Sequence, residues 1–258
     1  MAEAQKAEIS ILPPVEPGTP VPATDARHSV FVLDGVGGWL FCPLLVRRAL
    51  REAGLPLVTH THDWHRGLRG DLLTDLMWLK MNRFQAIQLA RRIRTLHRDD
   101  PEHRIDLIGF SGGGGVAVLT MEYLRDAQPL DTVILMAPAL SPRYDLSTAL
   151  SAARRCYHLF SCRDRFLLGA GTGLFGTIDR VRTSAAGRLG FLKPEAGGAG
   201  AEAYSKLRQI AWTPDLDNGR HAGGHTGWID PGFLRRHLPG LLADSPDLDY
   251  VAGWLEAD

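Results

Sequence analysis

Short apolar runs alternate along the chain with longer segments in which apolar residues recur at a helical period. Runs such as HSVFVL and IDLIG are almost continuously apolar over the length of a strand. Runs of this kind are typical of strands that are buried on both faces of a parallel sheet. The pattern predicts six strands, over residues 28–33, 57–61, 105–109, 133–136, 157–161 and 207–212.

The segments between these runs have the features of helices. Residues 83–96 carry apolar side chains at intervals of three, at Phe84, Ile87, Ala90, Ile93 and Leu96. Residues 43–53 begin with a proline and are followed by Gly54, which is the usual asymmetry of helix ends. Residues 115–127 and 233–242 have a similar pattern. This alternation predicts an α/β fold, with a mostly parallel twisted sheet, helices on both faces and right-handed crossovers.

The first 26 residues differ from the rest of the chain. They contain five prolines between positions 13 and 22 and offer few side chains that a core could bury. Such a segment favours an extended, polyproline-like backbone. We therefore expect residues 1–26 to form a flexible N-terminal tail, and residues 27–258 to form one folded domain.

The overall composition excludes several classes of protein. Lys and Arg together number 29 and so do Asp and Glu, which argues against a broad basic surface for nucleic acid. The three cysteines are too few for a disulfide framework. The N-terminus lacks the pattern of a signal peptide, and no uncharged apolar run approaches the roughly 20 residues of a membrane span. These features predict a cytoplasmic protein without an integral membrane segment.

The strongest chemical signal is the sequence GFSGG at residues 109–113, which fits the pattern G-x-S-x-G. It follows an apolar strand and opens a helix, which is the setting of a nucleophile elbow. A sharp turn there presents the Ser111 hydroxyl at the N-terminus of the helix, where the helix dipole favours a developing anion. The alternative is a phosphate-binding turn, but no Gly-Lys-Ser/Thr follows to make a P-loop.

A nucleophilic serine requires a base, and the base requires an orienting acid. In this kind of sheet the two partners follow the serine in the order acid, then histidine. Asp164 stands just past the fifth expected strand, with Asp145 as the alternative acid. His225 lies in a glycine-rich loop after the last expected strand, with His221 as the alternative base. We predict a Ser111, Asp164 and His225 triad.

The chain resembles the serine hydrolases of the α/β-hydrolase superfamily, which include carboxylesterases and lipases, over about residues 28–243. The resemblance rests on LDGVGGW after the first strand and on the motifs GFSGGG, SCRDRF and GGHTGW. It implies an oxyanion hole formed by the backbone N–H groups of Val36 and Gly112. Many relatives have a histidine where this chain has Asp34, so Gly35 and Gly37 remain alternatives for the first donor. It implies no cofactor, and the short segment after the fourth strand leaves no room for a large cap domain.

Three other features have alternative readings. The run HTHDWH at residues 60–65 looks like a metal-binding motif, but its aspartate stands one place early, and we expect a pocket wall or a polar edge and no metal. The glycines 171, 173 and 176 spell G-x-G-x-x-G without the preceding strand that a dinucleotide site needs. An apolar stretch within residues 66–82 is either core or a lid over the substrate. We assign to the substrate pocket Gly35, Gly37, Phe110, Met77, Trp78 and Trp228.

These features together predict a serine esterase, or a lipase-like enzyme, that acts on carboxylic esters with small to medium apolar acyl groups. The same triad would also serve an acyltransferase or a thioesterase. A non-catalytic ligand-binding protein on the same fold is the alternative from another class, because fold alone does not determine function. The expected partner is a small-molecule or lipid ester. Its neutral, apolar character suits a chain with no net charge.

Overall fold

The computed structural model describes residues 27–65, 75, 78–125, 129–164, 177–192, 200–216 and 220–243. The expected tail, Met77, most of the apolar stretch at 66–82 and the glycine motif at 171–176 lie outside the described residues.

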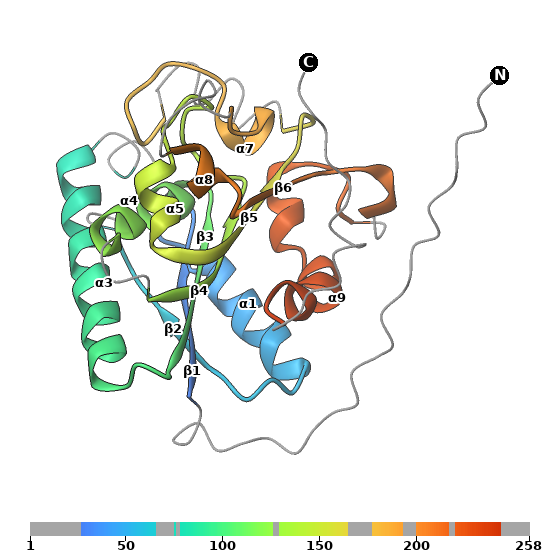
Figure 1. Ribbon diagram of the computed structural model, residues 1–258. Coiled ribbons are helices and arrows are strands. Elements are labelled where there is room, and N and C mark those ends of the chain that lie inside the picture. Colours follow the sequence, from blue (N-terminus) through green and yellow to red (C-terminus); the bar gives the residue numbers. More distant parts are fainter. Residues whose placement is uncertain are drawn as a thin grey trace.

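A single six-stranded sheet, with every pairing parallel, forms the centre of the protein (Figure 1). Its strand order is β2-β1-β3-β4-β5-β6. All six expected strands are present, and β4 and β5 begin three and four residues earlier than predicted because polar residues interrupt their apolar pattern. The strands are β1 (His28–Leu33), β2 (Val58–Thr61), β3 (Arg104–Phe110), β4 (Leu130–Met136), β5 (Ala153–Phe160) and β6 (Leu207–Ala211).

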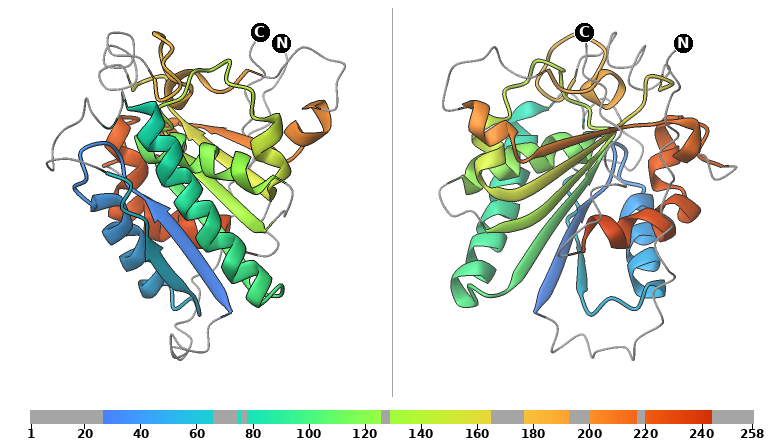
Figure 2. Two further views of the ribbon diagram at one scale, coloured as in Figure 1. Left: turned by 90° about the vertical axis from the view of Figure 1, so that its left-hand side faces the viewer. Right: turned by 45° about the vertical axis from the view of Figure 1, so that its right-hand side comes forward.

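Helices cover both faces of the sheet, as the α/β prediction requires (Figure 2). One face carries α1 (Phe41–Glu52) and α9 (Pro231–Leu241). The other carries α3 (Leu79–Asp99), α4 (Gly112–Leu124) and the short α5 (Ser147–Ser151). Shorter elements are α7 (Ala186–Leu189), α8 (Gly200–Tyr204) and the 3₁₀ turns η2 (Pro214–Leu216) and η3 (His225–Ile229).

Helix α4 begins three residues before the predicted start at position 115. The four glycines 112–115 are poor helix formers, and the predicted helix included only the last of them. The structure places all four in the helix, and all four are buried. Close packing against neighbouring backbone, described below, overrides the local preference.

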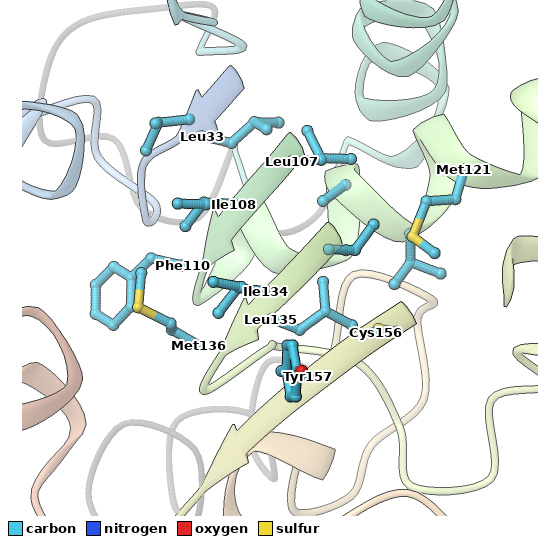
Figure 3. Close-up of a cluster of buried hydrophobic side chains, with 14 of the residues drawn as sticks. Leu33, Leu107, Ile108, Phe110, Met121, Ile134, Leu135, Met136, Cys156 and Tyr157 are labelled. Carbon is cyan, nitrogen blue, oxygen red and sulfur yellow. The ribbon is translucent and has the colours of Figure 1, made fainter. Parts of the chain in front are cut away.

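The core lies between the sheet and its helices and is built from the inner strands (Figure 3). Leu33, Leu107, Ile108, Ile134 and Leu135 are fully buried, and each such side chain contributes about 1.5–3 kcal/mol by leaving water. Toward the carboxyl ends of β3 and β4 the same cluster ends with Phe110 and Met136. The core therefore fixes the strand end from which residue 111 projects.

Residues 137–152, which connect β4 to β5, contain only the five-residue helix α5. The prediction that no large cap is inserted at this point is confirmed. Within the described ranges, no helix combines the length and apolarity needed to cross a membrane.

Candidate active site

Ser111 occupies a strained turn between β3 and α4. Its backbone has φ 53° and ψ −120°, a conformation that non-glycine residues rarely adopt and that costs on the order of 1–3 kcal/mol. Three backbone hydrogen bonds hold it there. The Ser111 N–H donates to Met136 O (2.9 Å), and Ser111 O accepts from the N–H groups of Gly114 and Ala139, at 3.0 Å each. Bonds to the end of the neighbouring strand thus maintain the strain.

Residues 109–114 form this turn, and we call them the elbow. The glycines of the elbow allow the chain to pack against the end of β1. A Cβ on Gly113 would lie 2.2 Å from Asp34 O, and one on Gly109 would lie 2.7 Å from Gly113 O. A Cβ on Gly112 would lie 2.6 Å from Cγ1 of Val36. This contact brings the backbone of Gly112 next to the loop after β1, which is the arrangement expected of two oxyanion-hole donors.

Asp164 and His225 form a close pair at the same end of the sheet. Asp164 follows β5, His225 begins η3, and Asp164 Oδ2 lies 2.5 Å from His225 Nδ1. Their side chains are 2% and 8% exposed, so little water competes for this contact. The alternative acid Asp145 accepts hydrogen bonds from Ser147 instead. The alternative base His221 is fully buried among aromatic rings.

Hydrogen bonds connect the turn after β5 to the loop before η3. Ser161 Oγ donates to Gly223 O at 2.7 Å, and the Asp164 N–H donates to Ser161 O at 3.0 Å. The Trp212 indole N–H donates to His221 O at 2.9 Å. Gly223 has φ +83°, and a Cβ there would lie within 3.0 Å of the Trp212 ring. These contacts fix the approach of the His225 loop to Asp164.

His225 and Ser111 lie near each other, as their contacts with Phe110 and Gly35 indicate. The ring centroids of Phe110 and His225 are 4.9 Å apart. Phe110 precedes Ser111, and a Cβ on Gly35 would lie 3.2 Å from Phe110 Cδ1 and 3.3 Å from Ser111 Cβ. The four residues therefore gather at the carboxyl end of the sheet.

Residues 34–40 connect β1 to α1 and include the predicted oxyanion donor Val36, and we call them the oxyanion loop. The carboxylate of Asp34 accepts hydrogen bonds from the N–H groups of Phe41 and Cys42, both at 3.1 Å, and so caps α1. The Gly37 N–H donates to Asp75 Oδ2 at 2.7 Å. Since this N–H is already engaged, Gly37 is a poor candidate for an oxyanion donor.

Three residues that contact the oxyanion loop were not singled out for this role by the sequence. The Trp64 indole N–H donates to Asp34 O at 2.9 Å, His65 Nε2 lies 2.7 Å from Gly35 O, and Asp75 accepts from Gly37. Trp64 and His65 lie within the histidine-rich run that resembles a metal motif. No local sequence pattern indicates these contacts, because Trp64 and His65 lie about 30 positions from the loop residues that they contact.

The predicted pocket residues are only partly brought together. Phe110 lies beside His225, and Gly35 lies beside Ser111. Trp78 is 47% exposed at the start of α3. The Trp228 side chain is fully buried and packs against His221 and Phe233, so it offers no surface to a substrate. We therefore do not keep Trp228 among the pocket residues.

The histidines of residues 60–65 have separate partners. His60 contacts Ser29 and Arg92, while His65 contacts Asp63 and Gly35. Burial lowers the pKa of both His60 and His62, and the nearby Arg92 lowers them further. Across the described part of the chain, no three metal-binding side chains converge on one point.

Comparisons with known proteins identify the fold. No protein-family profile matches the sequence, and no curated protein sequence matches it. The solved structure of m3DLH is similar, with a TM-score of 0.50, 20% identity and coverage of 83% of each chain. Esterase PE8 matches with a TM-score of 0.48 and 18% identity, over 84% of this chain and 95% of that one. A lipase-esterase related protein from Clostridium acetobutylicum matches with a TM-score of 0.48 and 9% identity, over 87% and 98%. At these identities the likeness concerns architecture, and the chain has the α/β-hydrolase fold.

Proposed function

We propose that this protein is a serine hydrolase that cleaves carboxylic esters of small to medium apolar acyl groups. The observation that carries the proposal is the 2.5 Å contact between Asp164 Oδ2 and His225 Nδ1, beside a strained Ser111. A carboxylate that binds Nδ1 of a histidine leaves Nε2 to act as the base. A purely structural turn has no need for a serine with φ 53°.

In the proposed mechanism, His225 accepts the proton of the Ser111 hydroxyl as the serine oxygen attacks the ester carbonyl. Asp164 holds the ring and stabilises the imidazolium that forms. The imidazolium then donates its proton to the leaving alcohol, and an acyl-enzyme remains on Ser111. A water molecule, activated by the same histidine, releases the acid and restores the serine.

The tetrahedral intermediate carries a negative oxygen that requires donors. The Gly112 N–H, at the start of α4, and the Val36 N–H are the proposed pair. Their support is the close contact of these two residues and the engagement of the Gly37 N–H by Asp75. Such donors act in a site with little water, where losing one typically costs about 10²- to 10³-fold in kcat.

An apolar acyl group is proposed because apolar side chains lie next to Ser111. Phe110 precedes Ser111, and Val36 and the Trp64 ring lie within 3.2 Å of a Cβ placed on Gly112. A chain with 29 basic and 29 acidic residues also provides no net charge to attract an anionic substrate.

The experiment that tests the proposal is a series of p-nitrophenyl esters from acetate to palmitate. We expect the wild type to hydrolyse them with a chain-length preference, and Ser111→Ala to lose at least 10³-fold in kcat. Ser151→Ala is the matched control, because its hydroxyl bonds to Thr148 O on the remote helix α5. Equal rates for wild type and Ser111→Ala would contradict the proposal. A fluorophosphonate probe should add mass to the wild type only, and no labelling would favour a binding protein.

A further inference from the structure

The end of the histidine-rich run, residues 63–65, turns back onto the oxyanion loop. His65 is the residue that contacts the loop at the peptide before Val36. Its Nε2 lies 2.7 Å from Gly35 O, and its side chain is 11% exposed. Because a carbonyl oxygen only accepts, this nitrogen must carry the hydrogen and donate it.

The two ring nitrogens of His65 also lie near carboxylate oxygens. His65 Nδ1 lies 2.9 Å from Asp63 Oδ1, and Nε2 lies 3.5 Å from Asp75 Oδ2. Both nitrogens therefore face oxygen acceptors. Asp63 thus holds the ring in the orientation that reaches Gly35.

Peptide geometry converts this contact into an orientation of the proposed oxyanion donor. Gly35 C=O and Val36 N–H belong to one planar trans peptide and point in opposite directions. When His65 holds Gly35 O on its own side, the Val36 N–H must point away from His65. A flip of this peptide would turn the N–H toward His65 and would present a carbonyl oxygen in its place, which repels an oxyanion.

The loop itself resists such a flip only in part. A flip of the Gly35–Val36 peptide rotates ψ of Gly35, which glycine tolerates, and φ of Val36, which a β-branched residue resists at positive values. Contacts from outside the loop add to this preference, and they are Trp64 on Asp34 O, His65 on Gly35 O and Asp75 on the Gly37 N–H. Of these, the His65 contact is the one made to the Gly35–Val36 peptide itself.

We infer that His65, oriented by Asp63, is a positioning residue that fixes the Gly35–Val36 peptide with its N–H directed to the oxyanion. The inference rests on the proposed hydrolase function and assigns a role to a residue that the mechanism itself does not use. His65 acts through the peptide and touches neither the substrate nor Ser111. Its effect falls on the transition state, because the oxyanion forms only there.

The test compares His65→Leu with His65→Gln, using p-nitrophenyl butyrate as substrate and phenylboronic acid as an inhibitor that forms a tetrahedral adduct with the serine. We expect His65→Leu to lower kcat about 10- to 100-fold, to change KM less than about threefold, and to weaken boronate inhibition by a factor similar to that for kcat. His65→Gln retains an N–H donor near the position of Nε2 and should stay within about fivefold of the wild-type kcat.

The matched control is His60→Leu, which removes another half-buried histidine from the same run. His60 contacts Ser29 and Arg92 and lies away from the oxyanion loop, so its kcat and boronate affinity should equal those of the wild type. Circular dichroism and a thermal melt establish that each variant is folded. If His65→Leu does not fold, Asp63→Ala provides the second variant, with an expected three- to tenfold loss of kcat, since the Asp63 side chain is 52% exposed and its removal leaves no cavity.

Two results would overturn the inference. One is a folded His65→Leu variant with wild-type kcat and boronate affinity, and the other is a loss that appears in KM alone. Ser111→Ala, assayed beside these variants, separates the two proposals. If Ser111→Ala is inactive while His65→Leu is fully active, only the positioning role fails. If Ser111→Ala retains wild-type activity, the proposed function itself fails.

Discussion

The elbow and the oxyanion loop face each other across the proposed oxyanion hole, yet they are held by different means. Backbone hydrogen bonds to Met136 O and from Ala139 N–H hold the elbow, together with glycines that tolerate no side chain. In the oxyanion loop, side chains make the contacts. The carboxylate of Asp34 reaches forward to α1, while Trp64, His65 and Asp75 reach in from another segment.

The difference separates the contributions of the two loops. The elbow is bonded to the end of β4 and packs against the end of β1, so disturbing it should affect folding as well as activity. The oxyanion loop is attached to an already folded sheet, so disturbing one of its side-chain contacts should affect activity more than stability. His65→Leu should therefore lose activity while it stays folded, and the predictions for Gly113 and Asp34 test the division through stability.

The largest effect on stability is expected at Gly113. A Cβ there would meet two backbone oxygens, Asp34 O at 2.2 Å and Leu33 O at 2.8 Å, which cannot move without displacing β1. We expect Gly113→Ala to lower the free energy of unfolding by more than about 3 kcal/mol, measured by urea denaturation. Gly224→Ala is the control, because a Cβ there meets nothing within 4 Å and its φ of −76° suits any residue. Similar stability of the two variants would show that the elbow is not part of the rigid sheet.

The second effect on stability is expected at acidic pH and comes from His158, which lies outside both loops. Burial lowers the pKa of His158, on β5, to about 4, and the hydrogen bond to Gln209 opposes the shift only in part. In the unfolded chain the pKa of a histidine is close to 6.5. Between pH 6.5 and 4 the unfolded state therefore binds more protons, and stability falls as the pH falls.

We expect His158 to lower the free energy of unfolding by about 2–3 kcal/mol between pH 6.5 and pH 4.5. His158→Leu should flatten the pH dependence of urea denaturation by that amount while it leaves both loops unchanged. If the slope stayed as in the wild type, acid would be acting elsewhere, with His237, whose pKa is also lowered by burial to about 4, as the first residue to examine.

The smallest effect is expected at Asp34, where the oxyanion loop meets α1. Removing a side chain that caps a helix typically costs about 1 kcal/mol, so Asp34→Ala should lose about 1–2 kcal/mol by urea denaturation. Asp34→Asn should lose less, because its amide oxygen still accepts from one N–H. A larger loss for Asp34→Ala than for Gly113→Ala would reverse the order that the comparison predicts.

The same contrast explains what the sequence could predict. The strands and the elbow follow from local patterns: apolar runs define β1 and β3, and glycines on both sides of Ser111 mark a sharp turn. Asp164 and His225 could be proposed from their order along the chain, and the structure places them in contact. The start of α4 was predicted wrongly, because glycine propensity is local whereas the packing of Gly113 on Asp34 O is tertiary.

The contacts of the oxyanion loop could not be predicted, because they depend on where side chains point. Position 34 stands out by its difference from relatives, but only the structure shows its carboxylate bonded to Phe41 and Cys42. Trp228 stands three positions after His225 and was assigned to the pocket. Its ring turns inward to His221 instead, and a one-dimensional pattern does not distinguish these two directions.

The position of β6 in the sheet has a consequence for how the protein responds to thermal fluctuation. Among the described strands, β6 bonds only to β5, whereas β3, which precedes Ser111, is bonded on both sides. The loop that carries His225 follows β6, and edge strands open at a lower free energy than the strands at the centre. Transient opening of this edge would move His225 away from the elbow and leave Ser111 bonded to the sheet. Under the proposed function, we expect activity to be lost at a lower temperature than the core unfolds.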